Sequence, residues 1–158
     1  MEVAVKLKSL VALFLISIGM SVFAENFDLA IPNGWMKKDQ TAALAQYQKG
    51  TGSFIVTVDT MPANANTPDK YIEYVKGKLK NTFKDIVFES VSTGKKETYE
   101  TRELKYNVSM SGLKLKYDVL YIFVQGKAYT LTAGNMEGSI NAEYTSDIKK
   151  LFMSFKLK

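Results

Sequence analysis

The side chains that most often carry out catalysis are missing from this chain. None of its 158 residues is a histidine or a cysteine. A Ser-His-Asp triad, a Cys-His pair, a histidine base and an ordinary zinc or copper site are therefore excluded. The chemistry that remains is serine activated by lysine, paired carboxylates, and hard cations bound by oxygen.

One serine-lysine motif occurs at Ser92–Lys95, where Ser-Thr-Gly-Lys fits the pattern Ser-x-x-Lys. In enzymes this motif opens a helix and works with further serine and lysine elements, which are lacking here. The same residues are no phosphate-binding loop, because Glu89 stands where a glycine is required and Lys96 where Ser or Thr must bind magnesium. We interpret Ser92–Lys95 as a turn between two strands.

Three acidic residues that are near neighbours in the sequence could form a cluster: Glu97, Glu100 and Glu103. On an extended segment, a spacing of three residues puts successive side chains on alternate faces. No Asp-x-Asx-x-Asx-Gly loop supports calcium either. We expect a solvated edge with ion pairs, and we expect no catalytic residue, no metal and no cofactor.

Two features are candidates for a partner-binding surface. Lys76, Lys78, Lys80 and Lys84 make the end of a predicted helix basic, which suits an acidic partner or phospholipid headgroups but also simply complements the helix dipole. Trp35 follows a tight turn, where a large ring either contacts a partner or closes the end of the core. The candidate surface is Lys76, Lys80, Lys84 and Trp35.

The first 24 residues have the pattern of an export signal. Lys6 and Lys8 precede an apolar run from Leu10 to Met20, and the segment 21–24 ends in Val-Phe-Ala, which predicts cleavage after Ala24. The apolar run is shorter than the roughly 20 residues that cross a bilayer, and no later segment approaches that length, so we expect no transmembrane segment in the mature chain. The expected location is the periplasm or the medium.

Composition limits the remaining chain, 25–158, to one domain of ordinary size. The whole sequence has 21 basic and 16 acidic residues and a net charge of +5. Because the basic residues are dispersed among acids, we expect no nucleic-acid binding. The expected oligomeric state is a monomer.

A helix is predicted from Thr67 to about Phe83. Thr67-Pro68-Asp69 supplies a capping hydroxyl, a proline at the first helical position and an acid near the positive helix end. The residues of its apolar stripe recur every four positions, so one side must lie on a flat surface. Gly77 predicts either close backbone packing or a weak point. The stripe is Tyr71, Val75, Leu79 and Phe83, with Ile72 beside them.

Alternating apolar residues predict strands on either side of this helix. A strand at 27–31 and a hairpin at 43–59 precede it, and strands at 86–91, 102–110, 113–125 and 128–133 follow it. In the strand 113–125 the second half is apolar on both faces, so both faces should be covered. The strand 102–110 also contains Asn107-Val108-Ser109, a glycosylation sequon if the host is eukaryotic.

A loop at 134–138 and a last helix, with Tyr144, Ile148 and Phe155 at helical spacing, complete the chain. Two amphipathic helices and one strand that is apolar on both faces predict an α+β fold. It would be a twisted antiparallel sheet of about six or seven strands flanked by helices in an αβα sandwich.

The order of elements resembles the PsbP/Mog1/DcrB-like superfamily. The residues that carry the resemblance are Ile31-Pro32-Asn33-Gly34-Trp35, the helix start at Thr67-Pro68, the strand 127–132 and the ending Ser154-Phe155-Lys156. The resemblance implies an αβα sandwich around an antiparallel sheet. Members range from a photosystem subunit to a binder of a nuclear GTPase and exported bacterial proteins, so it implies no particular function.

Two classes of function remain. The first is an exported, non-catalytic accessory domain that binds a protein of the cell envelope. The second is a carrier that holds a small apolar ligand between sheet and helix, with Tyr71, Tyr106, Tyr117 and Tyr121 as lining candidates. These tyrosines are equally compatible with an ordinary core.

Overall fold

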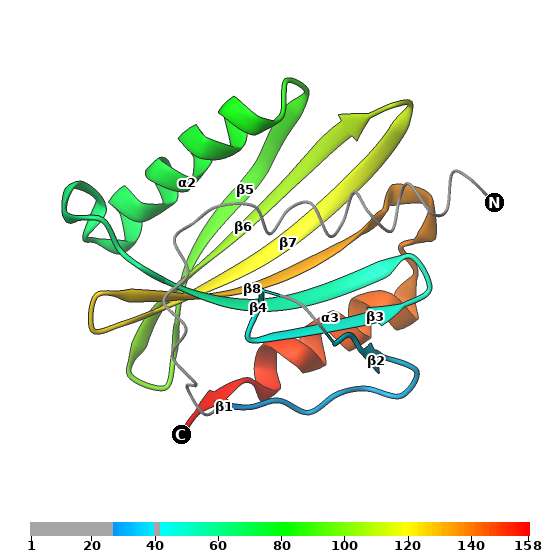
Figure 1. Ribbon diagram of the computed structural model, residues 1–158, viewed down its shortest axis with the longest axis horizontal. Coiled ribbons are helices and arrows are strands. Elements are labelled where there is room, and N and C mark those ends of the chain that lie inside the picture. The colour runs from blue at the N-terminus through cyan, green and yellow to red at the C-terminus, as the bar shows by residue number, and fades with distance from the viewer. Residues whose placement is uncertain (1–26, 40–41) are drawn as a thin grey trace.

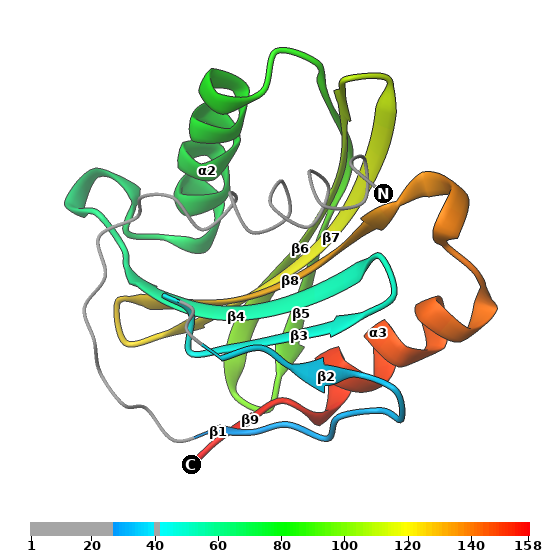
Figure 2. The same ribbon diagram turned by 45° about the vertical axis from the view of Figure 1, so that its right-hand side comes forward.

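The computed structural model describes residues 27–39 and 42–158, so the predicted signal segment lies outside the described residues. The main element is a seven-stranded antiparallel sheet with the strand order β2-β3-β4-β8-β7-β6-β5 (Figure 1). Helix α2 packs on one face and α3 on the other (Figure 2). The predicted α+β sandwich is confirmed.

The elements follow the predicted order of strands, helix, four strands and helix, with short additions. In chain order they are β1 (Phe27–Asp28), β2 (Met36–Lys37), β3 (Ala45–Lys49), β4 (Gly52–Thr60), the 3-10 turn η2 (Ala63–Ala65), α2 (Pro68–Thr82), β5 (Ile86–Lys96), β6 (Tyr99–Met110), β7 (Leu113–Val124), β8 (Lys127–Met136), the 3-10 turn η3 (Glu137–Ser139), α3 (Ala142–Ser154) and β9 (Lys156–Leu157).

Helix α2 begins as its sequence predicts. The Thr67 hydroxyl accepts a hydrogen bond from the Lys70 backbone N–H, and Pro68 occupies the first turn, where its missing N–H leaves no helical bond unmade. Asp69 in the same turn accepts a hydrogen bond of 2.8 Å from Nε of Arg102 on β6. This ion pair ties the start of the helix to the sheet.

The apolar stripe of α2 is buried as predicted, at Tyr71, Ile72, Val75 and Leu79. Gly77 lies on the other side of the helix. A Cβ added at Gly77 would meet no atom within 4 Å. The prediction of close backbone packing at this glycine is therefore wrong. The alternative, a point where the helix is conformationally weak, stays a prediction.

Strand β7 separates the two cores. Tyr117, Val119 and Tyr121 belong to the core under α2, whereas Leu120 and Ile122 belong to the core under α3. The prediction that the second half of this strand is covered on both faces is confirmed. The first half bears Lys114, Lys116 and Asp118 on the face that α3 leaves open.

Helix α3 is held by polar contacts at both ends. The Asn141 side chain caps the first turn by accepting from the Tyr144 backbone N–H at 2.8 Å. At the last turn, Nζ of Lys96 donates to the backbone carbonyls of Phe152 and Met153. Beyond the helix, β9 pairs with β1 and brings the two ends of the described chain together.

Three local expectations need correction. Ser92–Lys95 is not a turn, because β5 runs on to Lys96 and the chain reverses only after it, at Glu97, with φ of 56°. The predicted strand 27–31 is reduced to two residues. The predicted loop at 134–138 begins with strand, because Gly134 leaves room for the Tyr117 ring; an added Cβ would lie 2.6 Å from Tyr117 Cε1.

Candidate functional site

The candidate residues from the sequence do not come together in one place. Lys76 and Lys80 lie on the C-terminal half of α2, and Lys84 follows the helix. Trp35 packs in the core under α3, is only 7% exposed, and donates a hydrogen bond from Nε1 to Asp147 at 2.9 Å. The ring therefore has little surface to present to a partner.

The lysines of α2 stand over aromatic rings rather than extending freely into solvent. Nζ of Lys76 and Nζ of Lys80 lie 5.7 Å and 5.8 Å from the centroid of Phe88 on β5. Both distances allow cation–π attraction. Lys76 also pairs with Glu73 at 3.0 Å. The basic end of α2 is thus positioned directly beside the outermost strand of the sheet.

Strand β5 is the long open edge of the sheet (Figure 1). It spans 11 residues, and most of its side chains are exposed, with Val87 at 62% and Val91 at 42%. A register shift between Phe88 and Ser90 marks a bulge near its start. The opposite edge, β2, has only two residues. We call β5 together with Lys76, Lys80 and Lys84 the basic edge.

A second feature is the polar sheet face that α3 leaves open. Lys105 on β6 lies 3.3 Å from Glu103 and 3.4 Å from Asp118 on β7. Burial, followed by a hydrogen bond with Glu103, raises the pKa of Asp118 to about 7, although Lys105 opposes the shift. Oδ1 of Asp118 is buried without a hydrogen-bond partner. Burial therefore favours the protonated form of this carboxyl group well above the pH at which an exposed aspartate ionises.

The sequon residue Asn107 belongs to the same polar face. Its side chain donates from Nδ2 to Glu89 at 2.6 Å, and the residue is 7% exposed. A glycosyl transferase needs an accessible amide nitrogen, so the folded chain offers no acceptor here. Oδ1 of Asn107 is also buried without a partner.

The catalytic patterns of the sequence gain no supporting geometry. Ser92 and Lys95 lie three residues apart on β5, so their side chains leave the strand on opposite faces. Glu100 and Glu103 are separated in the same way on β6. Within residues 27–39 and 42–158, no group of three or more acidic side chains is arranged to hold a metal ion.

The tyrosines considered for a carrier pack against one another. Tyr106 and Tyr117 stack with ring centroids 5.0 Å apart, and Tyr71 meets Tyr121 edge to face at 6.0 Å. All four are buried in the core under α2. Burial raises the pKa of Tyr117 to about 12 and raises that of the other three as well. They are neutral rings of an aromatic core.

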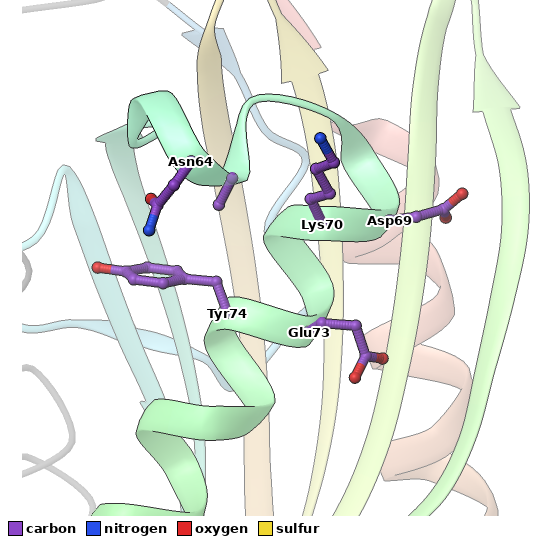
Figure 3. A pocket seen from close by; sticks show the side chains of 6 residues that line it. Asn64, Asp69, Lys70, Glu73 and Tyr74 are labelled. Carbon is purple, nitrogen blue, oxygen red and sulfur yellow. The ribbon is translucent and has the colours of Figure 1, made fainter.

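A surface hollow of about 520 Å³ lies between η2 and the start of α2, lined by Asn64, Ala65, Asp69, Lys70, Glu73 and Tyr74. Figure 3 shows the side chains of Asn64 and Tyr74 on one side of the helix, whereas those of Asp69 and Glu73 extend toward the other side. Asp69 is already bound to Arg102. Because its polar groups do not converge, this hollow lacks the arrangement typical of a ligand site.

Sequence reasoning selected the lysines but missed β5 as the surface beside them. The signal was the set of β-forming residues Val87, Phe88, Val91 and Thr93 in a stretch without proline. The assumed turn at Ser92–Lys95 cut that strand short. In the part of the chain that the structure describes, no helix is both long and apolar enough to cross a bilayer.

Two helices on opposite faces of this antiparallel sheet, in this chain order, make an αβα sandwich. No known family profile matches the chain, and no curated protein matches it. The fold is instead shared with solved structures of low sequence identity.

LpqN of Mycobacterium tuberculosis, described as involved in cell envelope biogenesis, aligns with a TM-score of 0.63 and 14% identity over 84% of this chain and 83% of its own. Cyanobacterial PsbP (CyanoP) of Synechocystis sp. PCC 6803 aligns with a TM-score of 0.60 and 15% identity over 91% and 99%. A Pseudomonas aeruginosa protein of unknown function, PA94, aligns with a TM-score of 0.56 and 13% identity over 89% of each chain. These structures confirm the fold that the sequence resemblance implied.

Proposed function

We propose that the protein is an exported, non-catalytic domain of the cell envelope that binds a protein partner through the basic edge. The observation that carries this proposal is the placement of Lys76 and Lys80 over Phe88, next to a long strand that has no neighbouring strand on its outer side within residues 27–39 and 42–158. Positive charge beside an open strand can attract and orient a partner.

The cellular location in this proposal rests on the predicted export signal and on the described role of a protein that has the same fold. LpqN, which shares the fold, is described as involved in cell envelope biogenesis. The proposed partner is a protein, and the proposal includes neither nucleic acid nor a membrane-spanning segment of the mature chain. We propose a monomer as the state that binds it.

The missing histidine and cysteine support a non-catalytic role, as do the separated side chains of the serine-lysine and glutamate patterns. The carrier alternative gains no support from the structure, because its candidate tyrosines fill the space between sheet and helix with one another's rings. Native mass spectrometry of protein from its own host would reveal a retained lipid or metabolite and so favour the carrier.

Site-specific photocrosslinking in the host tests the surface. A photoreactive residue at position 84 or 91 should capture the same envelope protein, and charge reversal by Lys76→Glu and Lys80→Glu should reduce that capture. Lys149, an exposed lysine of α3, is the matched control position. Capture that is equal from position 149, or unchanged by the charge reversal at low salt, would contradict the basic edge as the docking surface.

A further inference from the structure

The two edges of the sheet differ in how they are protected against pairing with another chain. Edge strands expose unpaired backbone N–H and C=O groups, and proteins usually shorten, charge or cover them. Edge β2 is two residues long and includes Lys37. Edge β5 is 11 residues long and has its bulge near its start, between Phe88 and Ser90. The segment 90–96 is therefore left regular.

The part of this segment from Ser90 to Thr93 suits strand pairing better than its end, Gly94-Lys95-Lys96. The whole segment reads Ser-Val-Ser-Thr-Gly-Lys-Lys, with no proline to interrupt a ladder of hydrogen bonds. Each of its residues pairs in regular antiparallel register with β6 on the inner side. Every second residue consequently directs its backbone N–H and C=O outward. Val91 adds an exposed apolar side chain at 42%.

The charges beside β5 indicate what kind of strand would fit. Lys76 and Lys80 stand over the Phe88 ring, and Lys84 is exposed just before the strand begins. Lys95 adds a further exposed positive charge near its end. Among the described residues, no carboxylate forms an ion pair with Lys80 or Lys84. Lys95 has Glu100 opposite it on β6, and acidic side chains are the complement of the unpaired charges of Lys80 and Lys84.

We propose that β5 accepts an extended, acidic segment of the partner protein as an additional strand of the sheet. This inference rests on the proposed function and specifies its mode of binding. The backbone ladder supplies affinity, and the lysines on the α2 side select acidic sequences and set their position along the edge. A second copy of the chain is a poorer occupant, because pairing β5 with β5 brings two basic edges together.

A synthetic peptide tests this mode without knowledge of the partner. The probe is a peptide of about seven residues that alternates valine with glutamate, long enough for a typical strand. Its first control has lysine in place of glutamate. Its second control keeps the acidic sequence but carries N-methyl groups on alternate backbone amides, which removes donors for pairing and leaves the charge unchanged. Binding is measured by fluorescence anisotropy and by amide NMR shifts.

We expect the acidic probe to bind about tenfold or more tightly than the lysine probe, and to bind as weakly as the lysine probe when it is N-methylated. Shifts and slowed amide exchange should concentrate in the segment 90–96. The double variant Lys80→Glu, Lys84→Glu should lose the preference for acid. Lys149→Glu on α3 should keep it, since that position is exposed and belongs to a different face.

Two results would overturn the inference in distinguishable ways. If the N-methylated acidic probe binds as well as the unmodified one and the lysine reversals still abolish binding, the basic edge binds acid without strand addition, and the proposed function survives. If acidic and basic probes bind equally weakly and host crosslinking at position 91 captures nothing, both strand addition and the proposed docking surface are wrong.

Discussion

The two ends of the seven-stranded sheet are built in opposite ways. At the β2 end the edge is short, and Trp35 closes the core beneath it with a hydrogen bond to Asp147, which also pairs with Lys49 at 2.9 Å. At the β5 end the edge is long and is regular from Ser90 to Lys96, and Val87 and Val91 face solvent. One end is closed by buried contacts between distant segments, whereas the other ends in a strand that has no partner strand on its outer side among the described residues.

This difference separates stability from recognition. Contacts at the closed end join residues 35, 49 and 147 across the whole chain, so breaking them should loosen the fold. The exposed residues Val87 and Val91 of the open end contribute little to packing, so changing them should alter the proposed binding and leave folding intact. The predictions below test that separation.

The largest effect is expected for Trp35→Ala. Removing a large ring that is 7% exposed should reduce the free energy of unfolding by about 3 to 5 kcal/mol. The matched change at the open end, Val91→Thr, keeps the β-branched shape on an exposed strand and should cost less than about 0.5 kcal/mol. Chemical denaturation of both variants measures this contrast, and similar losses would show that the two ends are not built differently.

The next effect lies within α2, which bridges the core and the basic edge. Leu79 is buried on the sheet side, so Leu79→Ala should cost about 2 to 5 kcal/mol. Its neighbour Lys80 contributes only an exposed cation–π contact with Phe88, and Lys80→Ala should cost less than about 1 kcal/mol. Urea titrations of the pair decide whether the helix register is as described; equal losses would rule it out.

Acid should destabilise the closed end. Desolvation raises the pKa of Asp147, but hydrogen bonds from Trp35 and Lys49 outweigh it and leave that pKa below its usual value. The carboxylate therefore stabilises the fold above about pH 4, where the unfolded group is ionised, and this contribution is lost as pH falls through the lower folded pKa. Asp147→Asn should cost more at pH 7 than at pH 3, with a smaller loss than Trp35→Ala. A loss that does not depend on pH would contradict this assignment.

The aspartate on the open face should respond to pH with the opposite sign. The pKa of Asp118 is raised to about 7 by burial, whereas an unfolded aspartate titrates near 4. Between those values the folded state holds the extra proton, so stability declines as pH rises from about 4 to 7. Asp118→Asn should weaken that decline and increase the melting temperature more at pH 8 than at pH 4. Asp28→Asn in β1, an exposed site, provides the control.

The smallest effect is a gain on the solvent side of α2. Gly77 is helical, with open space where a Cβ would lie. Gly77→Ala should therefore stabilise the protein by about 0.5 to 1 kcal/mol, chiefly by restricting the unfolded chain. Thermal unfolding followed by circular dichroism measures it. Destabilisation by this change would reveal a contact of α2 that the described residues do not include.

Local sequence patterns determined most of the elements. Thr67-Pro68-Asp69 specified the start of α2, because capping and proline geometry act within one turn. Alternation along 113–124 specified both faces of β7, since side chains of a strand point alternately to opposite sides. The absence of histidine and cysteine restricted the chemistry without any structure.

Tertiary contacts decided what local patterns could not. The reach of β5 depends on its pairing with β6 as far as Lys96 with Tyr99, so the glycine and serines at 92–94 form strand rather than turn. Gly134 remains in β8 because the Tyr117 ring from the neighbouring strand covers it. The basic edge exists only because strand order places β5 outermost and packing brings Lys76 and Lys80 over Phe88. Strand order and packing join residues far apart in the chain, and a single sequence carries no local signal of which distant residues will meet.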